Sequence, residues 1–197
     1  MRIYRMDPPG DCHWVTPVDP ADNDRLEYDS APLAEQWSPI EMQLVDGKGY
    51  QRMTSFPWHL NRLLMLRDDA IGALGPVLAD YGELLPLDCP GMELNVFRNL
   101  VTADVLDEEN SAIKYFEPEH ELWEVNSYAF RADRLDGLMI FRTTSWPDGP
   151  LLFTDPMIDE FERTGLGHLD FFALWDPEHG PYQRAAEGEL IEQDRRI

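Results

Sequence analysis

The sequence has few cysteines and no long apolar run. Its 197 residues contain two cysteines, Cys12 and Cys89, which are too few for a disulfide framework and stand in no metal-binding spacing. No stretch approaches the roughly 18 apolar residues that a membrane helix requires. The first residues, MRIYRMDPPGD, carry two arginines without the apolar run of a secretory signal. We therefore predict reduced thiols, no membrane association and a cytoplasmic location.

Basic residues are scarce as well. Sixteen Lys and Arg stand against 38 Asp and Glu, which gives a formal net charge of -22. This charge repels nucleic acid and anionic membranes, and it attracts basic proteins and speeds their encounter. An acidic protein without any charged partner would show the same number. The excess is uneven, because residues 99–197 hold 22 acids and 8 bases.

Familiar catalytic and cofactor-binding motifs are also missing. There is no GxSxG nucleophile motif and no HExxH zinc motif. The pair Gly165 and Gly167 lacks the third glycine of a dinucleotide-binding loop and follows an expected helix instead of preceding it. The five histidines are scattered along the chain. We expect no catalytic residues, no bound metal and no cofactor.

What is present predicts a packed domain rich in turns. The chain is 43% apolar and contains 16 prolines and 13 glycines, which favours short helices and many turns. Strand-like segments outnumber helical ones, and they lie at residues 3–6, 37–44, 63–66, 83–88, 93–98, 112–116, 122–130, 138–143, 151–153 and 169–175. This pattern predicts an α+β fold with a mainly antiparallel, meandering sheet and a few short helices.

Two helices are expected. The first begins at Asp68 as its cap and has apolar residues at helical spacing through residue 78, with Pro76 predicting a kink or two short turns. The second follows a cap at Thr154 or Asp155 and has a proline at its first position.

The chain divides by composition into three parts. Residues 1–49 are expected to form an irregular arm with short strands that belongs to the same domain. Residues 50–176 form the α+β core, and residues 177–197 form a polar tail that is partly helical near residues 185–191.

The stretch FEPEHELWEV, residues 116–125, concentrates charge. It is compatible with a metal site, a catalytic carboxylate cluster or a surface for a basic partner. On a strand, His120 and Glu124 share one side while Glu119 and Glu121 share the other, which divides the set and disfavours a metal. Trp123, flanked by Glu121 and Glu124, and Trp146, before Pro147-Asp148-Gly149, are each either an exposed anchor for a partner or a half-buried strand aromatic. The predicted partner-binding residues are Asp104, Asp107, Glu108, Glu109, Glu117, Glu119, Glu121, Trp123 and Glu124.

Segments spread over residues 50–176 resemble, in order, a known family. They are Phe56-Pro57-Trp58, Tyr81 to Leu87, Leu94-Asn95-Val96, Leu106-Asp107-Glu108 through Ser111, Tyr128 and Phe130, Ile140-Phe141-Arg142, Phe153-Thr154-Asp155, and Phe171 to Trp175. Together they resemble the eleventh numbered family of immunity proteins of bacterial polymorphic toxin systems, which is also catalogued as a domain of unknown function.

The resemblance implies a small α+β protein without enzymatic activity. Such a protein binds and blocks a toxin domain made by the same cell or delivered by sibling cells, often through a contact-dependent secretion system. The expected partner is a cognate toxin, and the acidic surface suggests a basic one such as a nuclease. Two alternatives stay open: a small metal-dependent hydrolase that uses the Glu117–Glu124 cluster, and a general mimic of nucleic acid. An exposed edge strand would also permit a homo-oligomer.

Overall fold

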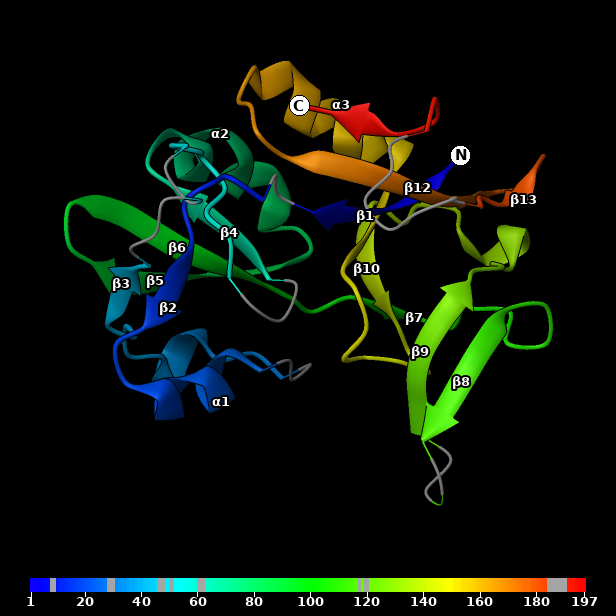
Figure 1. Cartoon of the computed structure of the whole chain (residues 1–197), viewed down its shortest axis with the longest axis horizontal. Coiled ribbons are helices and arrows are strands. Elements are labelled where there is room, and N and C mark those ends of the chain that lie inside the picture. Colours follow the sequence, from blue (N-terminus) through cyan, green and yellow to red (C-terminus); the bar gives the residue numbers. More distant parts are fainter. Residues whose placement is uncertain are drawn as a thin grey trace.

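The computed structural model describes residues 1–7, 10–27, 31–45, 49, 52–59, 63–116, 118, 121–183 and 191–197. Within these residues the fold is α+β, with short helices and mostly antiparallel sheets, as predicted. Figure 1 shows helices α2 and α3 along one side of the molecule and the β8–β9 hairpin projecting from the other.

The largest sheet has the strand order β13-β12-β1-β11-β10-β7, and β14 also pairs with β12. Its strands are β1 (Ile3–Asp7), β7 (Thr102–Ala103), β10 (Ile140–Thr143), β11 (Leu152–Thr154), β12 (Asp170–Asp176), β13 (Gly180–Pro181) and β14 (Arg195–Arg196). The first strand of the chain lies between β11 and β12, where Tyr4 stands opposite Phe153 and Ala173. The two ends of the described chain therefore meet in one sheet.

Three smaller sheets complete the strand inventory of the described residues. A three-stranded sheet has the order β4-β6-β5, and two further pairs join β2 to β3 and β8 to β9. Their strands are β2 (Val15–Pro17), β3 (Met42–Leu44), β4 (Leu64–Arg67), β5 (Gly82–Cys89), β6 (Met92–Asn99), β8 (Ala112–Phe116) and β9 (Glu121–Ser127). The helical segments are η1 (Pro20–Asp22), α1 (Asn23–Leu26), η2 (Ala34–Gln36), α2 (Asp69–Leu78), η3 (Ala132–Arg134) and α3 (Asp155–Thr164).

The large sheet is buried on both faces. On β1, Tyr4 and Met6 enter one core while Ile3 enters another. Strand β12 is buried along its whole length. Side chains alternate between the faces of a strand, so a strand covered on both sides reads as one continuous apolar run. The sequence of residues 171–175, FFALW, has this form.

One face of the large sheet is covered by α3, and α2 packs against α3 and over the β4-β6-β5 sheet. Helix α3 buries Met157, Ile158 and Phe161. Helix α2 buries three residues spaced four apart in the same core, and they are Ala70, Leu74 and Leu78. The ring of Phe161 lies 6.0 Å from that of Phe153 and 5.3 Å from that of Phe171. Edge-to-face packing of this kind adds to the free energy gained by burial.

The other face is covered by the chain between β7 and β10. Val105, Leu106, Val125 and Phe130 are buried there against residues of the large sheet that include Trp175. The β8–β9 hairpin belongs to this segment, so its base is part of a core while its far end extends into solvent (Figure 1).

Several local predictions need correction. Asp68 stands before α2, but its side chain makes no cap hydrogen bond. Its carboxylate instead accepts bonds from Arg67 Nε at 2.7 Å and from the amide of Glu93 at 3.1 Å. The strand expected at residues 37–44 is confined to β3, because residues 34–36 form a short helix and Trp37 donates its indole N–H to the carbonyl of Pro86.

Helix α3 matches its prediction more closely. It starts after Thr154, has proline in its first turn and ends at Gly165, whose φ of 69° is left-handed. Thr154 and Asp155 do not act as side-chain caps. The Thr154 hydroxyl donates to the carbonyl of Leu138, and the Asp155 carboxylate accepts from the Tyr4 hydroxyl at 2.8 Å. Asp155 therefore connects α3 to the first strand.

The remaining sequence predictions have mixed outcomes. Cys12 and Cys89 are free and buried. The expected helical segment near residues 185–191 falls almost entirely outside the described residues. Within the described chain, no helix has both the length and the apolar character needed to cross a bilayer.

Replacing Phe153 by alanine is expected to lower the free energy of unfolding by about 3–5 kcal/mol, because it leaves a cavity among packed rings. Phe116→Ala removes the same atoms from a side chain that is 54% exposed, so its effect should stay within about 0.5 kcal/mol. Urea unfolding followed by circular dichroism measures both values. Similar losses for the two variants would contradict the assignment of Phe153 to the core.

Acid should destabilise the protein through His59, which is fully buried. Its Nδ1–H donates to the carbonyl of Val15 at 2.9 Å, and Nε2 has no partner among the described residues. Burial lowers the pKa of His59, so the unfolded chain binds this proton more readily than the native protein. The contribution of neutral His59 to the free energy of unfolding should therefore be complete above pH about 6.5. Below that pH the free energy of unfolding should fall as the pH decreases.

The variant His59→Gln tests this dependence, since a glutamine amide can still donate to the carbonyl of Val15. Urea unfolding at several pH values should show a smaller loss for the variant below pH about 6.5. Some loss will remain, because burial also lowers the pKa of His13. Identical pH profiles for the two proteins would exclude His59 as the cause.

Candidate functional site

The β8–β9 hairpin contains an irregularity that places Trp123 outward. Lys114 stands opposite Glu124, while the next residue of β8, Tyr115, stands opposite Leu122. Trp123 is thus an extra residue without a counterpart, which is a β-bulge. Bulges bend a strand and redirect a side chain.

The bulge produces an exposed pair of aromatic side chains. Trp123 is 65% exposed and Phe116 is 54% exposed. Their ring centres lie 5.9 Å apart. Two large neighbouring aromatic rings that remain in solvent are typical of an interaction surface, because binding a partner removes them from water.

A groove lies beside this pair, between the hairpin and the loop at residues 144–150. Its volume is about 700 Å³. Three carboxylates and three aromatic side chains line it together with smaller residues, and these six are Glu108, Glu121, Asp148, Tyr115, Trp123 and Trp146. The groove therefore combines negative charge with flat apolar surfaces.

The loop that carries Trp146 is held by its own backbone. The amide of Trp146 donates to the carbonyl of Thr143 at 3.2 Å, and the amide of Gly149 donates to the carbonyl of Trp146 at 3.0 Å. A Cβ atom at Gly149 would come within 2.6 Å of the Trp146 ring. Glycine is needed here because the indole covers its Cα. Buried Arg142 also donates to the carbonyl of Gly149.

Three of the predicted partner-binding residues line the groove: Glu108, Glu121 and Trp123. Glu121 and Trp123 are exposed on β9. The Glu108 carboxylate accepts a hydrogen bond from the Tyr115 hydroxyl at 3.3 Å, and burial together with this carboxylate raises the pKa of Tyr115.

Three other predicted residues, Asp104, Asp107 and Glu124, are engaged in local interactions. Asp104 forms ion pairs with Arg131 and Arg134. Asp107 accepts bonds from the side chain and the amide of Asn110, which lower its pKa.

Glu124 pairs with Lys114 at 2.7 Å across the hairpin. Glu109 is exposed on the turn before β8. Glu117 and Glu119, like His120, lie outside the described residues.

Sequence reasoning did not assign Tyr115, Trp146 and Asp148 to the site. Trp146 and Asp148 stand in the turn Trp146-Pro147-Asp148-Gly149, which is separated from β9 by a strand and a short helix. The position of Trp146 before Pro147-Asp148-Gly149 marks it in the sequence as a possible exposed anchor, since turns lie at the surface, but no sequence signal connects it to the hairpin.

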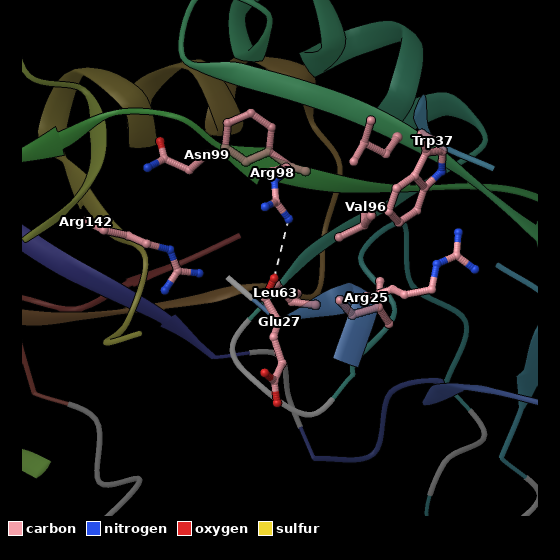
Figure 2. A pocket seen from close by; sticks show the side chains of 11 residues that line it. Arg25, Glu27, Trp37, Leu63, Val96, Arg98, Asn99 and Arg142 are labelled. Carbon is pink, nitrogen blue, oxygen red and sulfur yellow. Dashed lines mark hydrogen bonds between the residues drawn. The ribbon is translucent and has the colours of Figure 1, made fainter. Parts of the chain in front are cut away.

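A second cavity is lined by arginines. Figure 2 shows Arg98 and Arg142 reaching toward it, with the Arg98 guanidinium donating to the carbonyl of Glu27 at 3.4 Å. Arg98 also donates to the carbonyl of Ala31 at 3.2 Å. The cavity measures about 20 Å³, which is room for about one water molecule. Arg98 thus holds the N-terminal segment against β6, and the cavity has too little space for an organic ligand.

Other charged groups serve the fold. Asp170 holds Arg196 of β14 through two bonds, at 2.7 and 2.9 Å. Asp176 is buried, and hydrogen bonds from the Tyr182 hydroxyl and the His179 amide outweigh this burial and hold its pKa well below the usual range. In the part of the chain that the structure describes, no group of three or more His, Cys, Asp or Glu side chains could hold a metal ion.

Comparison with known proteins identifies no relative, since no protein-family model and no curated protein matches the chain. The resemblance to the immunity family therefore rests on the residues of the sequence alone and stays a prediction.

Trp123 should be the tryptophan most accessible to a quencher, since the other five are half-buried or buried. Replacing Trp123 by phenylalanine is expected to remove the most readily quenched part of the fluorescence and to leave the circular dichroism spectrum unchanged. Acrylamide quenching of the two proteins measures this. Equal quenching would mean that the Trp123 side chain is covered.

Proposed function

We propose that this protein is an immunity-type inhibitor that binds and blocks a cognate bacterial toxin domain. It acts by occupying a surface of the toxin and not by catalysis, and it needs no metal or cofactor. In this proposal the two proteins meet in the cytoplasm, and the toxin is a basic, nuclease-type effector of a contact-dependent secretion system.

The observation that carries the proposal is the exposed aromatic pair beside carboxylates on a projecting hairpin. Phe116 and Trp123 offer anchors that a partner can bury. Glu108 and Glu121 lie beside them and steer a basic surface toward the anchors. A hairpin that extends from the body of the protein can enter a concave site of the partner.

The overall charge also favours a basic protein as the partner. A net charge of -22 accelerates the approach of a basic protein and opposes binding to nucleic acid or an anionic membrane. A nuclease must hold a polyphosphate, so its active surface is basic. An acidic inhibitor gains both rate and selectivity from this difference. The affinity of the complex should therefore decrease as the salt concentration rises.

Co-expression with the product of the adjacent gene tests the function. We expect a one-to-one complex and rescue of growth from a toxic product. The double variant Phe116→Ala/Trp123→Ala should weaken the complex at least about tenfold, since buried aromatic anchors dominate interfaces. Met53→Ala is a matched control, because Met53 is 63% exposed and lies outside the hairpin and the groove. Calorimetry at low and high salt gives the affinities.

Two results would count against the proposal. A toxic neighbour that neither binds this protein nor is neutralised by it would exclude immunity toward that neighbour. If the affinity of the complex changes neither with salt nor with the two aromatic substitutions, the inhibitor function would stand. The hairpin would then not be the binding surface, and electrostatic attraction would not drive binding.

A further inference from the structure

We infer that the groove between the β8–β9 hairpin and the loop at residues 144–150 binds an arginine side chain of the partner. This inference rests on the proposed function, and it names the chemical group that the groove recognises. The occupant is an arginine on an extended segment of a basic protein.

The first argument is the location of unpaired negative charge. Asp104 and Glu124, which lie near the groove in sequence, are already paired with cationic side chains. Glu121 and Asp148 line the groove, are exposed and form no ion pair with a described residue. The groove is therefore a place where a cation adds a new interaction and does not replace an existing one.

The second argument is the chemistry of the walls. The carboxylates share the groove with Trp123, Trp146 and Tyr115. A guanidinium group stacks on aromatic rings through its flat face and donates hydrogen bonds to carboxylates through its edge. A lysine ammonium has neither a flat face nor a planar set of donors, so this combination favours arginine.

The third argument is that the groove has a suitable volume and is already formed in the free protein. A volume of about 700 Å³ accommodates an arginine together with neighbouring backbone atoms. The walls are held before any partner arrives, because Gly149 and its turn position Trp146 while Glu108 accepts a bond from Tyr115. A site that is already formed loses less conformational entropy on binding.

The test uses the full chain labelled with ¹⁵N and three short peptides. One peptide is Gly-Gly-Arg-Gly-Gly with blocked ends, the second has citrulline in place of arginine, and the third has lysine. Citrulline has nearly the same shape as arginine but no charge. The indole N–H signals of Trp123 and Trp146 report binding. We expect the arginine peptide to shift both signals, the lysine peptide to bind more weakly and the citrulline peptide to leave them unchanged.

Three variants locate the binding. Glu121→Gln/Asp148→Asn should weaken arginine binding by about two- to fivefold for each carboxylate removed. Gly149→Ala changes no charge but crowds Trp146, so it should also weaken binding. The control Asp24→Asn/Asp80→Asn removes the same charge from exposed positions outside the groove and should bind as the unmodified protein does.

Equal binding of the citrulline peptide, or equal weakening by the control pair, would overturn the inference. Stronger binding of the lysine peptide would overturn the choice of arginine. The toxin complex separates this inference from the proposed function. If Glu121→Gln/Asp148→Asn still neutralises the toxin with full affinity, the immunity function stands and the arginine site is wrong. If no toxin is neutralised, the immunity proposal fails, and the peptide titration decides the arginine site alone.

Discussion

The fold depends on covering both faces of its largest sheet. Strands β1, β11 and β12 carry apolar side chains on both sides, so neither face can remain in water. Helix α3, with α2 packed against it, covers one face, and the segment between β7 and β10 covers the other. Asp155 connects the first of these covers to the sheet, because its carboxylate accepts a hydrogen bond from Tyr4 of β1 while its backbone starts α3. Loss of either cover would expose the apolar residues of the core on that face.

This constraint also explains where the candidate site lies. The base of the β8–β9 hairpin is needed to bury the sheet, and Val125 is 7% exposed there. Two residues earlier, Trp123 is 65% exposed because the bulge interrupts the alternation of β9. One strand thus has a buried end and an exposed end, and the proposed binding surface lies at the exposed end. A rigid base lets the exposed rings keep their positions, which reduces the entropy lost on binding.

The sequence predicts the secondary-structure elements better than it predicts which of them lie side by side. Continuous apolar runs such as residues 171–175 indicate strands correctly, because burial on both faces leaves a clear pattern. The pairing of β1 with β11 and β12 joins residues about 150 to 170 positions apart, and no local pattern encodes it. The same limit applies to the groove. Glu108, Glu121 and Trp123 are close in sequence and could be predicted, whereas Trp146 and Asp148 reach the groove only through the tertiary fold.

Net charge alone is a poor guide to where an acidic protein binds. Asp104 and Glu124 are exposed or half-buried acids whose charge is compensated by neighbouring cations, and Asp107 serves a turn. Glu121 and Asp148 form no ion pair with any other residue that the structure describes, and aromatic rings share one groove with them. Long-range attraction depends on the sum of all charges, but it is screened within about 8–10 Å at physiological salt. In the proposed complex, discrimination between partners must therefore arise from the few carboxylates that a partner contacts directly, and the aromatic walls of the groove would favour arginine among the cations that reach them.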